Sequence, residues 1–153
     1  MSAGGHIVET LVVGGGPAGS ATAMTLARGG AEVELIERQA GPHDVVCGGF
    51  LGWDALAALR RLGVDYEKLG ARPIARLRLA SGRRVVEARL PRMAAGLSRR
   101  RLDEALLGEA ERSGAAISRG LAARSGDPAD RTVRMEDGSE IRCGALFLAT
   151  GKH

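Results

Sequence analysis

The chain has 153 residues, 44% of them hydrophobic and 26% charged, which is enough apolar material for one globular domain with its own core. Aromatic residues make up only 3%, and much of the net charge of +4 comes from arginines scattered along the chain. A nucleic-acid-binding surface gathers its positive charge and adds stacking aromatics, so we expect no nucleic-acid partner.

The first predicted elements are a strand, a helix and a second strand in close succession. Residues 7–13 form a short β-rich run of the kind found in buried parallel strands. Residues 17–28 show helical spacing, with Pro17 in the first turn, where a missing N–H costs nothing. Gly29-Gly30 ends this helix, and residues 32–36 form the second strand, which ends at Glu37.

The middle of the chain predicts an irregular loop, a helix and a hairpin. The loop covers residues 39–50, and apolar residues return at helical spacing over 51–62. Two β-rich runs, 74–80 and 84–90, lie on either side of Ser81-Gly82 and predict a β-hairpin. Pro91 is expected to end this hairpin.

The last third of the chain predicts one more helix and a return to strands. Residues 99–113 form the helix, and residues 115–118 form a core strand after it. A second hairpin pairs 132–135 with 140–143, and residues 145–149 form a last buried strand. The whole order predicts an α/β fold of the Rossmann type, a parallel sheet with a βαβ start and β-hairpin excursions.

The strongest chemical signal is the glycine-rich turn between the first strand and the first helix, Gly14-Gly15-Gly16-Pro17-Ala18-Gly19. The G-x-G-x-x-G pattern is weak by itself in a chain with 23 glycines, but here a strand leads in and a helix leads out. Gly14 permits the tight turn, Gly16 lets a pyrophosphate approach the backbone, and Gly19 lets the helix pack against the strand. The exposed N–H groups and the helix dipole would hold the phosphates.

Glu37 completes the pattern of a dinucleotide-binding unit, because it ends the second strand 18 residues after Gly19. A carboxylate at this place accepts hydrogen bonds from the hydroxyls of an adenosine ribose and repels a 2′-phosphate, which argues against NADP. The fingerprint alone does not distinguish FAD from NAD. Its alternative is a glycine-rich turn with a surface glutamate and no ligand.

Residues 11–38, LVVGGGPAGSATAMTLARGGAEVELIER, resemble the opening of flavoprotein oxidoreductases of the p-hydroxybenzoate hydroxylase type. That superfamily includes members that resemble geranylgeranyl reductase. The resemblance implies FAD as the cofactor and NAD(P)H as the usual electron donor. It also implies that Arg38, beside Glu37 at the strand end, belongs to the cofactor site.

Three further stretches support this resemblance. Cys47-Gly48-Gly49 resembles a segment that lies near the flavin ring in the reductase branch, where two glycines let the backbone approach closely. Arg99-x-x-Leu102-Asp103-x-x-Leu106 resembles a helix that brings an arginine to the FAD pyrophosphate. Ala149-Thr150-Gly151 resembles a segment that passes the adenosine side of the cofactor. Without the resemblance each stretch has a simpler interpretation. The Cys47 segment is then an ordinary loop, and Arg99 is a solvated arginine no different from Arg100 and Arg101. The last segment is then a buried strand that ends at a glycine.

The resemblance thus assigns cofactor contacts to several separate segments. The implied set is Gly14, Gly16, Pro17, Ala18, Gly19, Glu37, Arg38, Cys47, Gly48, Gly49, Arg99, Ala149, Thr150 and Gly151. It also implies an FAD-binding βαβ unit with the following loop and helix (1–70), a hairpin excursion of substrate-domain type (71–96) and a return to the FAD-binding domain (97–153). Family members continue with a Gly-Asp motif before a helix. Gly126-Asp127 precedes a hairpin instead, so the C-terminal half of the family fold is expected to be missing.

The function implied by the resemblance is an FAD-dependent oxidoreductase of monooxygenase or reductase type that acts on a small-molecule substrate. No catalytic acid or base can be named in this stretch. One alternative is a non-catalytic module that binds FAD or ADP. Another is an NAD-dependent dehydrogenase domain, against which the Cys-Gly-Gly loop and hairpin after Glu37 argue.

Other classes lack their signals. Cys47 and Cys143 are far apart in the sequence, which excludes a disulfide framework and a zinc pattern. It also excludes the cysteine pair that a disulfide reductase needs. The three histidines are isolated and predict no metal cluster. There is no signal peptide, and no apolar stretch approaches the ~20 residues that a spanning helix needs. We therefore expect a cytoplasmic protein without a transmembrane segment. The sequence does not indicate an oligomeric state.

Overall fold

The computed structural model describes residues 6–151, which divide into two compact units. The first unit combines the chain up to His43 with the chain from Asp103 onwards, and the second unit is Asp44–Leu102. Each unit has its own sheet. Across the described residues, no helix combines the length and the apolar character needed to cross a bilayer.

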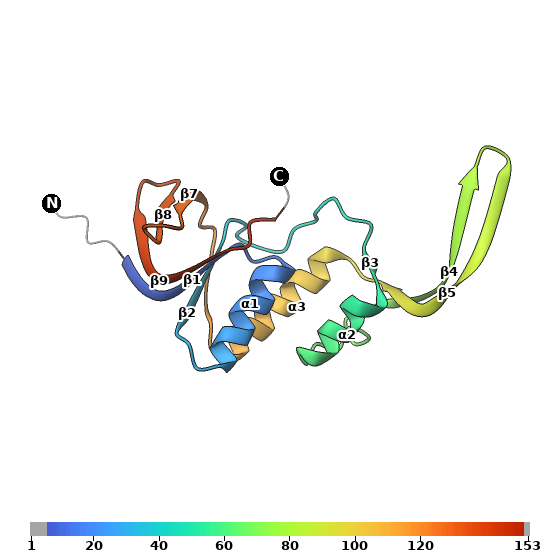
Figure 1. The fold of residues 1–153 in the computed structure, drawn as a ribbon, viewed down its shortest axis with the longest axis horizontal. Coiled ribbons are helices and arrows are strands. Elements are labelled where there is room, and N and C mark those ends of the chain that lie inside the picture. Colours follow the sequence, from blue (N-terminus) through green and yellow to red (C-terminus); the bar gives the residue numbers. More distant parts are fainter. Residues whose placement is uncertain (1–5, 152–153) are drawn as a thin grey trace. The chain divides into compact units, whose positions relative to one another are not determined.

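The first unit contains a six-stranded mixed sheet (Figure 1). Its strands in spatial order are β6 (Ala116–Arg119), β2 (Val33–Glu37), β1 (His6–Val13), β9 (Glu140–Leu148), β8 (Thr132–Met135) and β7 (Ala123–Asp127). The four strands from β6 to β9 run parallel, whereas β8 pairs antiparallel with both β9 and β7. The parallel part is the Rossmann-type core, and the antiparallel part is an excursion at one side of it.

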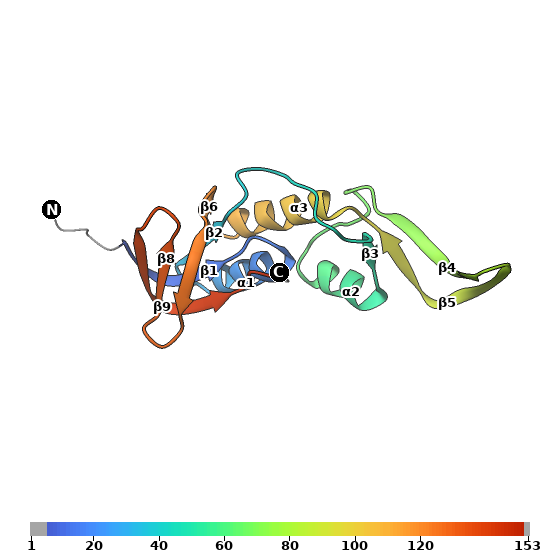
Figure 2. The same ribbon diagram turned by 90° about the horizontal axis from the view of Figure 1, so that it is seen from above.

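The two faces of the parallel strands are covered by different elements. Leu11, Val13 and Ile36 form one buried cluster with Val133 and other side chains of β8 and β9. Alternate residues of a strand point to opposite faces, so the buried Val12 and Leu35 face the other side. That side is covered by α1 (Pro17–Arg28) and by the part of α3 (Arg99–Arg112) from Asp103, which run side by side in Figures 1 and 2.

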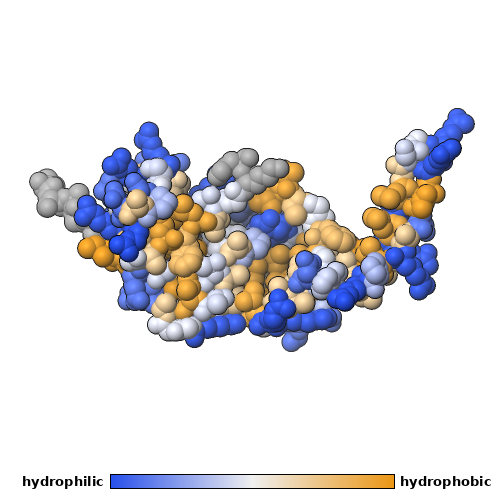
Figure 3. Space-filling model, viewed as in Figure 1, coloured by the Kyte–Doolittle hydropathy of each residue, from blue (hydrophilic) through white to orange (hydrophobic). Residues whose placement is uncertain are grey.

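The second unit has a short helix and a long two-stranded ribbon. Its elements are β3 (Phe50–Leu51), α2 (Trp53–Arg61), β4 (Arg72–Ser81) and β5 (Arg84–Gly96). Pairing from Arg76↔Arg89 to Ser81↔Arg84 makes an antiparallel ribbon whose side chains are nearly all exposed. Figure 3 shows hydrophobic and hydrophilic residues together on its surface. Leu77, Leu79 and Val86 lie on one face of this ribbon, because Leu79 pairs directly with Val86.

The predicted fold class is confirmed, with corrections to single elements. The prediction that Pro91 ends the hairpin is wrong, because β5 continues to Gly96. The proline lies between Arg89 and Ala94, in the interval where the pairing with β4 shifts, so its missing N–H removes no ladder bond. The strand β7 was not predicted, and β3 was placed in a loop and a helix.

The two predicted strands 140–143 and 145–149 are one strand, β9. It pairs in parallel with β1 from Ile141 to Leu148 in a single register, with only Gly144 passed over. Gly144 lies where the predicted strands were separated, and a Cβ there would be 2.8 Å from the carbonyl oxygen of Glu9. This glycine therefore marks a close approach of β1 rather than a turn.

Candidate dinucleotide-binding site

The candidate site lies at the carboxyl edge of the parallel strands. In the sheet, β1 lies between β2 and β9. From β1 the chain continues to β2 on one side and returns much later as β9 on the other side, so the switch point of the strand order lies between β1 and β9. Val13 is paired with both Ile36 and Leu148 at this edge. Ligands of open α/β sheets bind in the crevice at such a switch point, beyond the carboxyl ends of the strands.

The turn after β1 is fixed to both neighbouring strands. The Gly14 N–H donates to the Ile36 carbonyl at 2.9 Å, and the Ala149 N–H donates to the Val13 carbonyl at 2.8 Å. Gly14 has a φ of +107°, and a Cβ on it would lie 2.4 Å from the Ala149 carbonyl oxygen. Only glycine fits here, because both the backbone conformation and the space exclude a side chain.

Gly19 brings α1 against this turn. A Cβ on Gly19 would lie 1.8 Å from the carbonyl oxygen of Gly14, far inside any real contact distance. The buried glycine thus lets the first turn of the helix rest directly on the loop backbone. This is the close packing predicted from the sequence for the third glycine of the motif.

Glu37 lies beside the same turn and is held by two backbone donors. Its Oε2 accepts a hydrogen bond from the Gly15 N–H at 2.6 Å, and its Oε1 accepts one from the Gln39 N–H at 2.8 Å. A Cβ on Gly15 would be only 3.0 Å from the Glu37 side chain. A carboxylate has about four lone-pair sites, so the fixed carboxylate retains acceptor capacity for further donors.

The start of α1 supplies the donors of an anion site. Gly16 caps the helix with an extended backbone, and Pro17 occupies the first helical position. The first N–H groups of a helix have no partner inside it, and the helix dipole adds partial positive charge there. The glycine loop and this helix start therefore form a cradle that fits a diphosphate, with the Glu37 carboxylate on the neighbouring strand.

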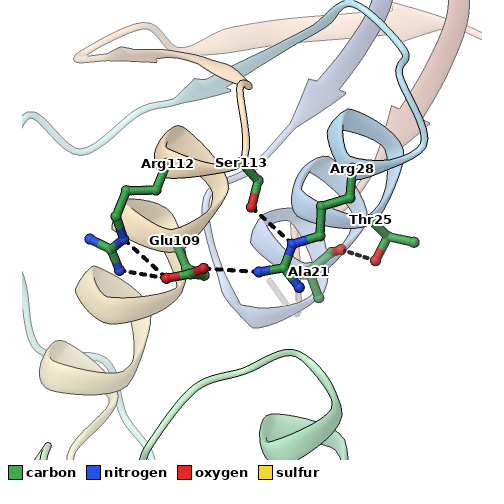
Figure 4. Close-up of polar contacts among 6 residues, drawn as sticks. All are labelled: Ala21, Thr25, Arg28, Glu109, Arg112 and Ser113. Carbon is green, nitrogen blue, oxygen red and sulfur yellow. Dashed lines mark hydrogen bonds and ion pairs between the residues drawn. The ribbon is translucent and has the colours of Figure 1, made fainter.

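The far end of α1 is tied to α3 by an ion-pair network (Figure 4). Arg28 donates to Glu109 at 2.9 Å and to the Ser113 hydroxyl at 3.1 Å. Glu109 also accepts two hydrogen bonds from Arg112, and the arginine hydrogen bonds lower the pKa of its carboxyl group. The network fixes the C-terminal turn of the helix whose N-terminal turn carries the site.

A positive charge stands next to Glu37 but is already engaged. Arg119 ends β6 and pairs in register with Glu37. Its guanidinium forms a forked ion pair with Glu104 at 2.9 and 2.8 Å, which raises the pKa of Arg119. Arg38, which directly follows Glu37 at the end of β2, is exposed.

Ala149, Thr150 and Gly151 follow β9 at the same edge as the glycine turn. The backbone contacts of Ala149 with Val13 and Gly14 place the start of this segment directly beside the turn. Thr150 and Gly151 are exposed, and Gly151 has a φ of +79°. The structure thus brings together the predicted residues of the first, second and last segments, namely Gly14, Gly16, Pro17, Ala18, Gly19, Glu37, Arg38, Ala149, Thr150 and Gly151.

The remaining predicted residues lie in the second unit. Cys47 and Gly48 are exposed, and the Cys47 sulfur accepts a hydrogen bond from the Gly49 N–H at 3.4 Å. Gly49 has a φ of +64° and its carbonyl accepts from the Leu97 N–H at 2.8 Å, so this loop is fixed to the end of β5. A Cβ on Gly49 would be 3.0 Å from the Leu97 carbonyl oxygen, which explains the glycine.

Arg99 is the first residue of α3 and is half-buried. The two arginines beside it are used within the second unit. Arg100 lies 4.0 Å from the Asp44 carboxylate, and Arg101 donates to the Leu69 carbonyl at 3.3 Å. Arg100 and Arg101 thus each have a partner within the second unit.

Three residues at the glycine turn were not among the predicted site residues. Gly15 and Gln39 donate their N–H groups to Glu37, and the Ser20 hydroxyl donates to the Gly15 carbonyl at 3.0 Å. Ser20 is fully buried. The sequence does show a serine directly after the last motif glycine, but its burial is visible only in the structure.

These features define a dinucleotide-binding site of the Rossmann type. The chain belongs to the FAD binding domain family, whose model matches residues 7–145. It is 32% identical over 152 residues to the menaquinone reductase of Mycobacterium tuberculosis (strain ATCC 25618 / H37Rv), covering 94% of this chain and 37% of that protein. The predictions of this family and of FAD as the cofactor are confirmed.

Solved structures share the fold at lower identity. A geranylgeranyl bacteriochlorophyll reductase-like protein from Thermoplasma acidophilum matches with a TM-score of 0.79 and 21% identity, over 97% of this chain and 40% of that one. The flavin-dependent monooxygenase PieE, in complex with FAD and substrate, matches with a TM-score of 0.74 and 21% identity, over 96% and 31%. The chain thus spans less than half the length of these relatives.

Proposed function

We propose that this chain is the cofactor-holding part of an FAD-dependent oxidoreductase of reductase or monooxygenase type. The observation that carries the proposal is the junction of the glycine turn, the start of α1 and the fixed carboxylate of Glu37 at one strand edge. That junction fits an adenosine diphosphate, which is one half of FAD.

Each part of the junction has a separate task in this proposal. The N–H groups at the start of α1 hold the pyrophosphate, and Gly16 offers no side chain to keep it away. Glu37 accepts hydrogen bonds from the ribose hydroxyls with the lone pairs that Gly15 and Gln39 leave open. Arg38 and the segment from Ala149 to Gly151 border the adenosine, because both follow strands that end at this edge.

The second unit supplies the remaining proposed contacts. Arg99 offers a guanidinium fork suited to phosphate oxygens. The loop at Cys47, Gly48 and Gly49 offers bare backbone to the flavin ring. We assign the excursion 71–96 to the substrate side, supported by the exposed apolar row of Leu77, Leu79 and Val86.

The bound flavin supplies the transfer of electrons between a donor of the NAD(P)H kind and a small-molecule substrate. The chain's own residues bind it, orient it and exclude a 2′-phosphate from the adenosine end. The relative at 32% identity is named a menaquinone reductase, so quinones are the first substrate class to test.

Titration of the purified chain with FAD, followed by quenching of flavin fluorescence, tests the cofactor site. We expect saturable binding that Glu37→Arg weakens by about tenfold or more, because it replaces an acceptor of the ribose with a cation. Gly16→Phe should weaken it by blocking the phosphates. Glu32→Arg makes the same charge change at an exposed position just before β2 and should leave binding unchanged.

The result also separates the alternatives. Absence of FAD binding in the wild-type chain would refute the proposal, and binding of NADH in its place would favour a dehydrogenase. If the full-length enzyme binds FAD but neither NADH nor NADPH reduces the flavin, the result would favour a non-catalytic binding module.

A further inference from the structure

The hydroxyl of Ser20 makes an unusual bond for a helical serine. It donates to the carbonyl of Gly15, five residues earlier and outside the helix, at 3.0 Å. The hydroxyls of Thr22 and Thr25 on the same helix donate to the carbonyls four residues earlier, at 2.8 and 2.7 Å. Ser20 is fully buried, whereas the two threonine bonds are exposed, and of the three bonds only that of Ser20 reaches a residue that precedes α1.

The peptide groups on both sides of Gly15 are thereby held. Its N–H donates to Glu37 Oε2 at 2.6 Å, and its carbonyl accepts from the Ser20 hydroxyl. The Ser20 N–H also donates to the Gly16 carbonyl at 2.9 Å. One buried residue therefore directs two successive carbonyls of the turn toward the helix.

The direction of the Gly15 carbonyl fixes the direction of the next N–H. The peptide bond is planar, and none of those described is cis, so the carbonyl of Gly15 and the N–H of Gly16 point to opposite sides. The carbonyl points to the buried Ser20, so the Gly16 N–H points away from the helix interior. Gly16 itself is partly exposed at the N-cap of α1, where an anion would bind.

We infer that Ser20 is a positioning residue for the diphosphate, because its hydroxyl holds the Gly15–Gly16 peptide with the Gly16 N–H turned to the ligand. The inference rests on the proposed function, since it concerns the same site. Removing the hydroxyl frees the peptide to rotate and leaves the Gly15 carbonyl without its partner. The substitution should weaken the binding of the phosphates and not the binding of the adenosine.

The test compares ADP and adenosine as probes of the 153-residue chain, with binding followed by NMR titration. Ser20→Ala should weaken ADP binding about tenfold, the size of one hydrogen bond to a charged group, and change adenosine binding less than about twofold. Thr25→Ala removes a hydroxyl-to-carbonyl bond from the same helix and should change neither. A merely structural role of Ser20 would weaken both probes alike, or neither, and would overturn the inference.

A second measurement needs no variant and therefore holds even where Ser20→Ala fails to fold. In the wild-type chain, the amide resonance of Gly16 should shift with ADP and remain unchanged with adenosine. An ADP complex in which the Gly16 amide does not respond would overturn the inference while leaving the proposed function intact. Failure of the wild-type chain to bind ADP at all would instead refute the proposed function.

Discussion

A pair of glycine-to-alanine substitutions in helices tests how tightly the site is built. Gly19 lies in α1 and Gly108 in α3, so alanine should favour both helices by up to about 1 kcal/mol. The surroundings differ. A Cβ on Gly108 would meet only the end of the Arg112 side chain at 3.4 Å, whereas a Cβ on Gly19 would lie 1.8 Å from the Gly14 carbonyl oxygen.

The magnitude follows from the backbone contact. Real Cβ contacts stay above 3.0 Å, so Gly19→Ala forces the loop and the helix apart by at least the difference between 3.0 and 1.8 Å. Overpacking of this kind costs about 1–3 kcal/mol or more and outweighs the gain in helix propensity. We expect a net loss of about 2 kcal/mol, which lowers Tm by roughly 4–8 °C in a domain of this size.

Thermal unfolding followed by circular dichroism, together with ADP titration, measures both consequences. Gly19→Ala should lose stability and bind ADP poorly, because the N–H groups of the first turn move away from the phosphates. Gly108→Ala should be as stable as the wild type or more so, with unchanged ADP affinity. Equal stability and equal affinity of the two variants would refute the close packing of α1 on the turn.

Two further predictions concern an ion pair of the first unit and the two thiols, one of which lies in each unit. Glu109→Gln should destabilise the chain by roughly 0.5–1 kcal/mol at neutral pH. Because the pKa of Glu109 is lowered on folding, its contribution is present above the ordinary value of 4.5 and is lost as pH falls through the folded pKa. Urea unfolding at pH 7 and pH 3 checks this, and an equal difference at both pH values would contradict it. Cys47 is exposed, whereas burial raises the pKa of the Cys143 thiol, so a disulfide reagent at pH 8 should modify Cys47 quickly and Cys143 only on unfolding. Two equally fast thiols would contradict this.

The glycine turn was predictable from the sequence because its chemistry is local. The strand that leads in, the motif glycines and the carboxylate at the end of β2 all lie between residues 6 and 37, and short-range patterns specify them. The helix α1 was predicted with the bounds that the structure has. Even the close contact of Gly19 with Gly14 joins residues only five positions apart.

The rest of the site depends on contacts that no local pattern contains. The parallel pairing of β9 with β1 brings Ala149 to Gly14 across more than a hundred residues, and Gly144 looked like an interruption of the strand. The assignment of Arg100 to Asp44 and of Arg101 to Leu69 depends on how the second unit folds. Composition and spacing could place an arginine at the start of α3, and only the family resemblance selected Arg99 over its neighbours.

The ribbon of β4 and β5 shows why exposure decides between two interpretations of the same pattern. Alternation of apolar and charged residues predicts a strand with one buried face. The pairing is confirmed, and the register does place Leu77, Leu79 and Val86 on one face and Arg76, Arg78 and Arg89 on the other. Yet Leu79 and Val86 are each 63% exposed. Isolated two-stranded ribbons are marginal in water, and an exposed apolar face of this kind is typical of a surface that packs against another element or a ligand. The exposed apolar face is compatible with the proposed place of residues 71–96 on the substrate side, and it is an observation independent of the glycine turn that supports the cofactor.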